Sequence, residues 1–239
     1  MSGHSKWSTI KRKKEINDKA RAQVFSKLSR IITLAVFEGG GIADPAGNVG
    51  LRIAIDRARA ANMPRANIDR AIEKAKRGGA DNLREVVYEG FAPGGVSLII
   101  SATTDNPNRA LSEIKNKLEK LGGKLGSEHS VMYQFVKCGV VEFDENSKED
   151  DVYSFADSIG ALDIEVHNGA YFVYIPFDKI GYVAEYVGKT LESRGADIFY
   201  KPQMTVSTTE QGIANIDRIV DALEELDDVD SVYTNLNII

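Results

Sequence analysis

The sequence has few of the residues that carry redox, nucleophilic or metal chemistry. It contains one cysteine, Cys138, one tryptophan, Trp7, and three histidines. A single cysteine excludes an intramolecular disulfide and fits a reducing compartment. The histidines, His4, His129 and His167, stand far apart, and with Cys138 they form no spacing typical of a zinc site.

Long hydrophobic runs are also missing. No stretch approaches the ~18 uninterrupted apolar residues of a membrane-spanning helix, and the N-terminus runs directly into charged residues without a signal-peptide core. A hydrophobic content of 43% with 27% charged residues is ordinary for a globular protein, and 239 residues suffice for two or three domains. We therefore expect a cytoplasmic protein that has no membrane partner.

Catalytic motifs are absent as well. The segment 183–190 ends like a phosphate-binding loop, but Val183 stands where that motif needs its first glycine. The carboxylate pairs at 150–151 and 227–228 are adjacent in sequence, so their side chains point apart in a helix or strand. The sequence thus predicts a protein that is not an enzyme and that has no cofactor and no metal site, and nothing in it sets an oligomeric state.

What the sequence does have is a strong asymmetry of charge. Residues 1–79 carry 17 Lys and Arg against 7 Asp and Glu, a net charge of +10. Residues 80–239 carry 13 Lys and Arg against 28 Asp and Glu, a net charge of −15. Such a segregation of charge indicates a polyanionic partner, usually nucleic acid or a membrane surface.

Two groups of basic residues are candidates for phosphate contacts. The first group joins five cations to the tryptophan: Lys6, Trp7, Lys11, Arg12, Lys13 and Lys14. The cations can bind phosphates, whereas Trp7 can either stack on an unpaired base or pack the N-terminal arm onto the rest of the domain. The second group, Arg70, Lys74 and Arg77, lies at i, i+4 and i+7 on one face of a predicted helix. Like charges at this spacing destabilise an isolated helix, so the row is useful for tracking a polyanion.

Three other polar clusters have simpler interpretations. Arg52, Asp56 and Arg59 share a helix face with alternating charge, which favours a solvated salt-bridge ladder over a binding stripe. The segment 103–109 could hold an anion at a helix start, but its Asp and Asn residues favour helix capping. The acidic residues between 224 and 230 are most simply a solvated face, and they could also repel nucleic acid so that only the basic segment docks.

Hydrophobic periodicity predicts three helices in the first 79 residues. The first begins at Asp18 and ends at the glycines 39–41, and the second follows Asn48. The third begins at Pro64 and ends at Gly78-Gly79, and we expect Asn67 to cap its start.

After residue 79 the period changes from 3.6 to 2, which indicates strands. A strand hairpin is predicted over 86–101, followed by a helix over 108–121 and a strand over 130–135. A helix over 213–226 and a strand over 231–236 complete this module.

Residues 139–202 follow the order strand, helix, strand, strand, helix, strand, which is the ferredoxin-like pattern, with the second helix over 179–194. We therefore expect an α+β protein in which a three-helix domain precedes two ferredoxin-like α/β domains, one inserted in the other. The expected bounds are 1–79 for the basic helical domain, 80–136 plus 203–239 for the discontinuous domain, and 137–202 for the inserted domain.

Several long motifs also follow one another in order along the chain. They include Gly3-His4-Ser5-Lys6-Trp7, Gly39-Gly40-Gly41, Leu51-Arg52-Ile53-Ala54-Ile55, Asn62-Met63-Pro64, Tyr88-Glu89-Gly90-Phe91-Ala92-Pro93-Gly94-Gly95-Val96, Thr104-Asp105-Asn106 and Leu226-Asp227-Asp228-Val229. Together they resemble the YebC/PmpR family over nearly the whole chain, and the match is least close at 139–202.

The resemblance implies a helical domain and two α/β domains, one of which interrupts the other. It implies a cytoplasmic bacterial regulator of gene expression, described as a DNA-binding transcriptional regulator. Mitochondrial relatives act as translational activators of cytochrome c oxidase subunit I, and bacterial relatives are linked to the ribosome and to translation of proline runs. The family brings no catalytic site, and because its opening motif starts at Gly3 we expect no mitochondrial presequence.

Three hypotheses about function follow. The first is a DNA-binding transcriptional regulator, the second is a ribosome-associated translation factor that contacts rRNA or tRNA, and the third is a protein-binding adaptor. The first two use the same phosphate electrostatics. The helix with the basic row has no Asn or Gln beside that row at a base-reading position, so we expect weak reading of sequence. An adaptor would expose a large apolar surface and bind with little dependence on salt.

Overall fold

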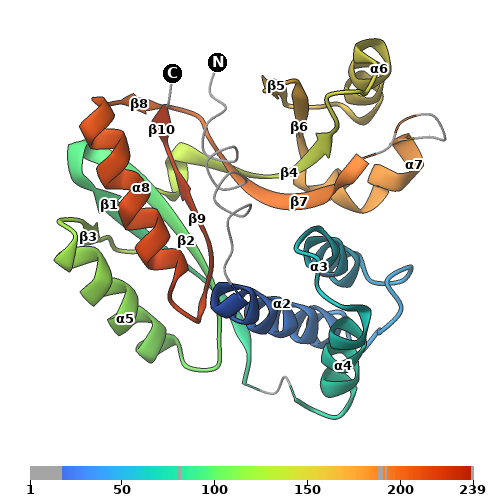
Figure 1. Cartoon of the computed structure of the whole chain (residues 1–239), viewed down its shortest axis with the longest axis horizontal. Coiled ribbons are helices and arrows are strands. Elements are labelled where there is room, and N and C mark those ends of the chain that lie inside the picture. The colour runs from blue at the N-terminus through green and yellow to red at the C-terminus, as the bar shows by residue number, and fades with distance from the viewer. Residues whose placement is uncertain (1–17, 80–81, 188–190, 192, 238–239) are drawn as a thin grey trace.

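The protein is represented by a computed structural model that describes residues 18–79, 82–187, 191 and 193–237. It consists of a helical unit and two four-stranded sheets with their helices, and in Figure 1 the helical unit lies below the second sheet and beside the lower end of the first. Along these described residues, no helix combines the length and the apolarity needed to cross a membrane.

The helical unit consists of α2 (Asp18–Glu38), α3 (Val49–Ala60) and α4 (Arg65–Lys76), which confirms the three predicted helices. Asn48 begins α3, because its Oδ1 accepts the backbone N–H of Leu51 at 3.0 Å. The three helices bury their apolar stripes against one another. This core, separate from the cores of the sheets, is formed by Leu28, Ile32, Val36, Leu51, Ala54, Ile55, Ala58, Met63, Ile68, Ala71 and Ala75.

The first sheet has the strand order β3-β1-β2-β9, and every neighbouring pair is antiparallel. Its strands are β1 (Arg84–Ala92), β2 (Val96–Thr104), β3 (Lys124–Leu125) and β9 (Val229–Thr234). β1 and β2 form the predicted hairpin, with a short 3-10 turn at Pro93–Gly95. β9 comes from the C-terminal end of the chain and pairs with β2, as the pattern of the sequence predicts.

Helices α5 (Pro107–Lys120) and α8 (Glu210–Glu224) cover one face of this sheet (Figure 1). The apolar faces of both helices pack on inward side chains of β1 and β2. The short strands β8 (Val206–Ser207) and β10 (Leu236–Asn237) form a separate parallel pair. Along the chain the order is two strands, a helix and a strand, then a helix and a strand after the second sheet.

The second sheet has the strand order β5-β6-β4-β7 and lies wholly within residues 135–202. Its strands are β4 (Phe135–Phe143), β5 (Asp163–His167), β6 (Ala170–Pro176) and β7 (Ser193–Pro202), and α6 (Glu149–Ile159) follows β4. The two central strands, β4 and β6, are antiparallel neighbours.

The predicted helix over 179–194 is confirmed only in part. A 3-10 segment at Phe177–Tyr182 leads into the short helix α7 (Val183–Val187), and β7 already begins at Ser193. The ladder between β7 and β4 extends as far as the pair Ser193 and Phe143. At Ser193 and Arg194, strand pairing therefore overrides the local preference for a helix, which is a common effect of tertiary context.

The predicted strand over 130–135 is also wrong, because a 3-10 turn occupies Met132–Gln134 and the strand begins at Phe135. The buried carboxylate of Glu89 accepts the backbone N–H groups of His129, Val131 and Met132 at 2.6, 2.6 and 2.8 Å. Those donors are therefore not available for a strand ladder. The three hydrogen bonds outweigh burial and lower the pKa of Glu89.

A shared hydrophobic core joins the two sheets. Ile99 and Tyr233 of the first sheet pack with Cys138, Tyr174 and Phe199 of the second. The opposite face of the second sheet packs on α6 and α7. β4 is therefore buried on both faces, which explains its nearly continuous apolar sequence.

Candidate nucleic-acid interface

Two rows of polar side chains in the helical unit differ in what they contact. The outer row is the predicted one, Arg70, Lys74 and Arg77 on α4. The inner row, Gln23, Lys27 and Arg30 on α2, was not predicted. Both rows have the spacing i, i+4, i+7, so each lies along one helix face.

All three side chains of the outer row are exposed, and α4 lies at the outer edge of the helical unit (Figure 1). Arg70 is held by neutral groups: its Nε donates to the carbonyl oxygen of Ala66 at 3.1 Å, and its Nη2 donates to Oδ1 of Asn67 at 2.7 Å. Within the described residues, Arg70, Lys74 and Arg77 make no ion pair. Arg77 lies near enough to Glu73 to help lower the pKa of that carboxyl, but Glu73 pairs with Lys76, so the row keeps a net positive charge toward solvent.

The two carboxylates of α4 pair with other cations. Lys76 lies 2.7 Å from Glu73, and the hydrogen bond from Lys76 lowers the pKa of Glu73. Arg65 lies 3.8 Å from Asp69. Both pairs are exposed, so the net positive charge of the helix remains on its outer face.

The prediction that Asn67 caps α4 is wrong. Pro64 stands at the N-cap position, where no side-chain hydrogen bond caps the helix. The Asn67 amide oxygen instead accepts from Arg70. The first group of candidates, at positions 6, 7 and 11–14, lies outside the described residues, so its role stays a prediction.

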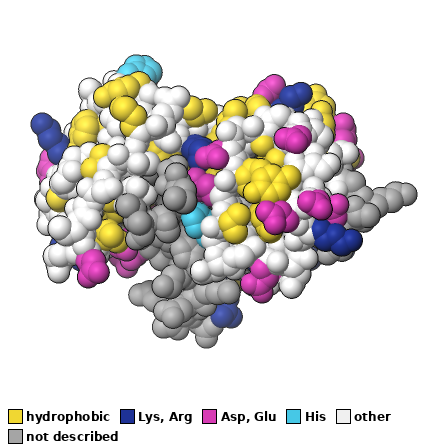
Figure 2. Space-filling view, turned by 90° about the horizontal axis from the view of Figure 1, so that it is seen from above, with side chains coloured by type: hydrophobic (Ala, Val, Ile, Leu, Met, Phe, Trp, Pro, Cys, Tyr) yellow, Lys and Arg dark blue, Asp and Glu magenta, His cyan; other side chains and the backbone are white. Residues whose placement is uncertain are grey.

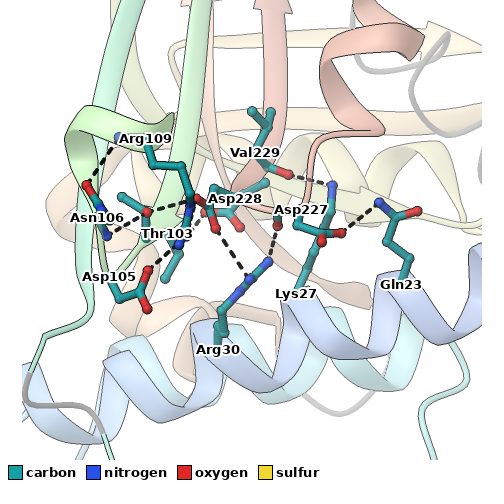
Figure 3. A network of polar contacts seen from close by, with 12 residues as sticks. Gln23, Lys27, Arg30, Thr103, Asp105, Asn106, Arg109, Asp227, Asp228 and Val229 are labelled. Atoms are coloured by element: carbon teal, nitrogen blue, oxygen red, sulfur yellow. Dashed lines mark hydrogen bonds and ion pairs between the residues drawn. The ribbon is translucent and has the colours of Figure 1, made fainter. Parts of the chain in front are cut away.

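The inner row faces an acidic segment at residues 224–230, which joins α8 to β9 (Figure 3). Lys27 donates to the carbonyl oxygens of Glu224 and Val229, the latter at 2.7 Å. Arg30 donates to the carbonyl oxygen of Asp227 and lies 3.4 Å from Oδ1 of Asp228.

Gln23 extends the inner row by donating to Oδ1 of Asp227 at 3.0 Å and to the carbonyl oxygen of Glu225. The expectation that the acidic segment is a solvated face is therefore wrong for Asp228, which is buried, and for Asp230, which is half-buried, whereas Glu225 and Asp227 are exposed. The segment is the surface that receives α2, and we call residues 224–230 the acidic cover.

Asp228 is the centre of this contact, and its side chain is 4% exposed. Besides Arg30, it accepts hydrogen bonds from Nη2 of Arg109 at 2.8 Å and from Oγ1 of Thr104 at 2.9 Å. Arg109 also lies 2.8 Å from Asp105. The anion that Arg109 holds is thus a carboxylate of the chain itself.

The capping interpretation of the 103–109 segment is confirmed. Asn106 is the N-cap of α5, and its Oδ1 accepts the N–H of Arg109 at 3.1 Å. The hydroxyl of Thr104 accepts the N–H of Asn106 at 3.0 Å. The loop therefore joins a helix cap to the Asp228 cluster in one network (Figure 3).

Burial perturbs the charged groups at this contact. Burial lowers the pKa of Lys27, although Asp230 and Glu224 oppose the shift. Burial raises the pKa of Asp230 to about 6, against the effects of the Thr103 hydrogen bond and the nearby cations. Lys27 and Asp230 are therefore both desolvated where α2 packs on the sheet.

α3 also turns its arginines toward the second sheet. Arg57 lies 3.0 Å from Asp197, and this pairing keeps the pKa of Arg57 raised even though burial alone would lower it. Arg52 donates to the carbonyl oxygen of Gly181 at 2.7 Å. In the predicted ladder, Asp56 pairs with Arg59 at 3.4 Å, while Arg52 belongs to the contact with the sheet.

The described residues of the sheets provide few groups suited to metal binding, nucleophilic attack or phosphate binding. Among the described residues, no group of three or more His, Cys, Asp and Glu side chains could hold a metal ion. Cys138 is buried, and burial raises its pKa to about 11, so its thiol is a poor nucleophile. On the face shown in Figure 2, Asp and Glu side chains surround hydrophobic ones in the right-hand lobe, where Lys and Arg are sparse.

Comparisons with known proteins cover nearly the whole chain. The family model "TACO1/YebC protein N-terminal domain" matches residues 5–78, and "TACO1/YebC second and third domain" matches residues 83–236. A relative from Roseiflexus castenholzii is 42% identical, with 100% of this chain and 96% of the relative covered. A relative from Thermus thermophilus is 41% identical, with 99% and 97% covered. Both are named probable transcriptional regulatory proteins.

A solved structure is similar over most of the fold. The crystal structure of a conserved hypothetical protein from Aquifex aeolicus superposes with a TM-score of 0.82 at 38% sequence identity. The superposition covers 92% of this chain and 91% of that chain.

Proposed function

Because the chain belongs to the TACO1/YebC family, we propose that it is a non-enzymatic regulator of gene expression that binds nucleic acid through its helical unit. DNA is the first candidate partner, in keeping with the transcriptional names of its relatives. The observation that carries the proposal is the outer row on α4. Its three cations are exposed and make no ion pair among the described residues, whereas the inner row is held by the acidic cover.

The chemistry of the outer row supports binding to phosphates. Arg70 presents a guanidinium held by neutral acceptors, which leaves further N–H groups for a bidentate phosphate contact. Lys74 and Arg77 continue the row along the helix and suit a backbone with regularly spaced charges. Phosphate contacts of this kind supply affinity that depends on salt but carry no sequence information.

A second candidate partner is ribosomal RNA or tRNA. The observation that favours it is the engagement of Asn67, the amide nearest to the row, by Arg70. An amide held in this way is poorly placed to read a base edge, so the geometry supports recognition of a backbone rather than of an operator sequence. Crosslinking in living cells with recovery of both DNA and RNA distinguishes enrichment at promoters from enrichment on ribosomal RNA.

Charge reversal tests the interface. The variant Arg70→Glu, Lys74→Glu, Arg77→Glu is expected to weaken binding to duplex DNA and to reduce the slope of log affinity against log salt by about 2.7, at roughly 0.9 per phosphate contact. A matched control, Lys115→Glu, Lys120→Glu, Lys124→Glu, changes the net charge equally on an exposed surface of the first sheet unit. An unchanged slope in the α4 variant, or equal losses in both variants, would remove this row from the interface.

We also propose the domain bounds expected from the sequence, 1–79, 80–136 plus 203–239, and 137–202, together with a cytoplasmic location. Each sheet has a core cluster of its own beside the cluster that the two share, which supports two sheet domains, and β4 begins at Phe135, two residues before the expected bound at 137. Absence of catalysis is part of the proposal as well. Turnover of DNA, RNA or nucleotides in the presence of magnesium that is lost on changing a carboxylate would contradict it. Binding that does not respond to salt would favour the protein-adaptor hypothesis.

A further inference from the structure

The inner row of α2 is bound to oxygen atoms of the acidic cover. Lys27 donates to two backbone carbonyl oxygens, and Arg30 donates to one carbonyl oxygen and to the carboxylate of Asp228 (Figure 3). The carbonyl of Glu224 lies at the C-terminal end of α8, where the helix dipole adds negative potential. The lysine ammonium and arginine guanidinium groups that donate to these oxygens are also the groups that bind phosphate oxygens in proteins.

The helical unit does not depend on this contact for its own core. Its apolar side chains form a separate cluster, and Ile53 is the residue of the unit that joins a core cluster of the sheets. Val49 of α3 also packs beside Gly181, and the other contacts described above are polar and come from α2, Arg52 and Arg57. Partly polar contacts of this kind between units of one chain resemble transient interfaces, which allow relative motion.

The contact is also imperfectly satisfied. Nε of Arg30 and Oδ1 of Asp230 are buried and have no hydrogen-bond partner within the described part of the chain. A buried donor or acceptor without a partner destabilises the state that contains it. The hydrogen bonds of Lys27 and Arg30 stabilise the closed arrangement, and the two buried atoms without partners destabilise it. A contact that opens and closes requires such a balance.

We infer that the acidic cover is removable and conceals a second phosphate-binding row on α2, so that the helical unit binds a nucleic-acid backbone with both rows once α2 separates from residues 224–230. This inference rests on the proposed function. In the closed state the cover occupies Lys27 and Arg30 and leaves the outer row alone to make first contact. A polyanion then competes with the cover for the inner row.

Cross-linking the cover tests the inference on the full chain. In the variant Gln23→Cys, Asp227→Cys, a short cleavable bis-maleimide joins two side chains that are in contact in the native protein, while buried Cys138 is a poor competitor for the reagent. The cross-linked protein is expected to bind duplex DNA with a salt slope about 1.8 shallower than after the linker is cleaved, because two phosphate contacts are withheld. Equal slopes before and after cleavage would overturn the inference.

Opening the cover should have the opposite effect. Asp228→Asn keeps the side-chain shape but removes the buried negative charge that Arg30 faces, and it is expected to raise affinity about tenfold at low salt and to steepen the slope. Adding Lys27→Ala and Arg30→Ala to this variant should remove the gain. A gain that survives their removal would show that the inner row is not the second surface.

A distance measurement separates failure of the inference from failure of the proposed function. Spin labels at Ala66→Cys on α4 and Ser112→Cys on α5 report the position of the helical unit against the first sheet. We expect a narrow distance distribution in the native protein at low salt and a longer, broader one in the Asp228→Asn variant. An unchanged distribution in that variant overturns the inference even if DNA binding is intact, whereas opening without any DNA binding overturns the proposed function.

Discussion

The carboxylate of Asp228 should contribute more to stability than any exposed carboxylate of the helical unit. Its side chain is 4% exposed and accepts from Arg30, Arg109 and Thr104. Removing one partner of a buried ion pair costs about 3–5 kcal/mol, because the other charge is left buried. Arg109 is 45% exposed and keeps Asp105, so water and this second carboxylate recover part of the loss. We therefore expect Asp228→Ala to lower the free energy of unfolding by about 3 kcal/mol.

A double-mutant cycle isolates the term that belongs to Arg30. The cycle of Arg30→Met with Asp228→Ala should give a coupling energy of about 1–2 kcal/mol, since the pair is largely buried but 3.4 Å apart. The matched cycle of Arg65→Met with Asp69→Ala tests a pair whose side chains are 93% and 62% exposed, and it should give less than about 0.5 kcal/mol.

Urea unfolding of the full chain, followed by far-UV circular dichroism, measures both cycles under the same conditions. Hydrogen exchange of the α2 amides supplies a local readout, because loss of the contact should increase exchange there before it affects the sheets. Equal coupling energies in the two cycles, or a cost below about 1 kcal/mol for Asp228→Ala, would refute the reasoning from burial.

Three further predictions concern pH, reactivity and a helix cap. Burial raises the pKa of Asp230 from 3.8 to about 6, so the stabilising contribution of its protonated form is full below the lower value and is lost as pH rises through the upper one. The free energy of unfolding of Asp230→Asn should therefore rise relative to that of the native protein by up to about 3 kcal/mol between pH ~4 and ~7, and a pH-independent difference would contradict this. With a pKa of about 11, the thiol of Cys138 should react with a disulfide reagent about 100-fold more slowly in the native than in the unfolded protein at pH ~8, and fast native labelling would count against burial. Asn48→Ala should cost about 2–3 kcal/mol in urea unfolding, because Asn48 caps α3 and also donates to two carbonyls, whereas Thr209→Ala, which removes a cap alone, should cost about 1 kcal/mol.

Local pattern was sufficient for the helical unit and for the first hairpin. The apolar spacing and Asn48 define α2 and α3, and both features act within a few residues. Pattern failed where distant partners compete for the backbone. Ser193 and Arg194 belong to β7, which pairs with β4, instead of ending a helix, and Glu89 takes the amides of the 129–132 segment away from a strand.

The candidate interface divides in the same way. The spacing of Arg70, Lys74 and Arg77 predicts a row on one helix face, and those side chains are exposed on α4. The role of Asp228 was missed, because in sequence it is one acidic residue among several near the C-terminus. A usable signal was the same i, i+4, i+7 spacing at Gln23, Lys27 and Arg30.

By itself the sequence determined that the first third is helical and basic, and that each helix carries its charge along a face. Only the tertiary structure decided which face remains available. Lys27 and Arg30 contact partners about 200 residues away in the chain, whereas the outer row contacts no such distant partner among the described residues. The spacing of charges along a helix is a local property, but their neutralisation depends on which distant segment packs against them, and that is set by the fold.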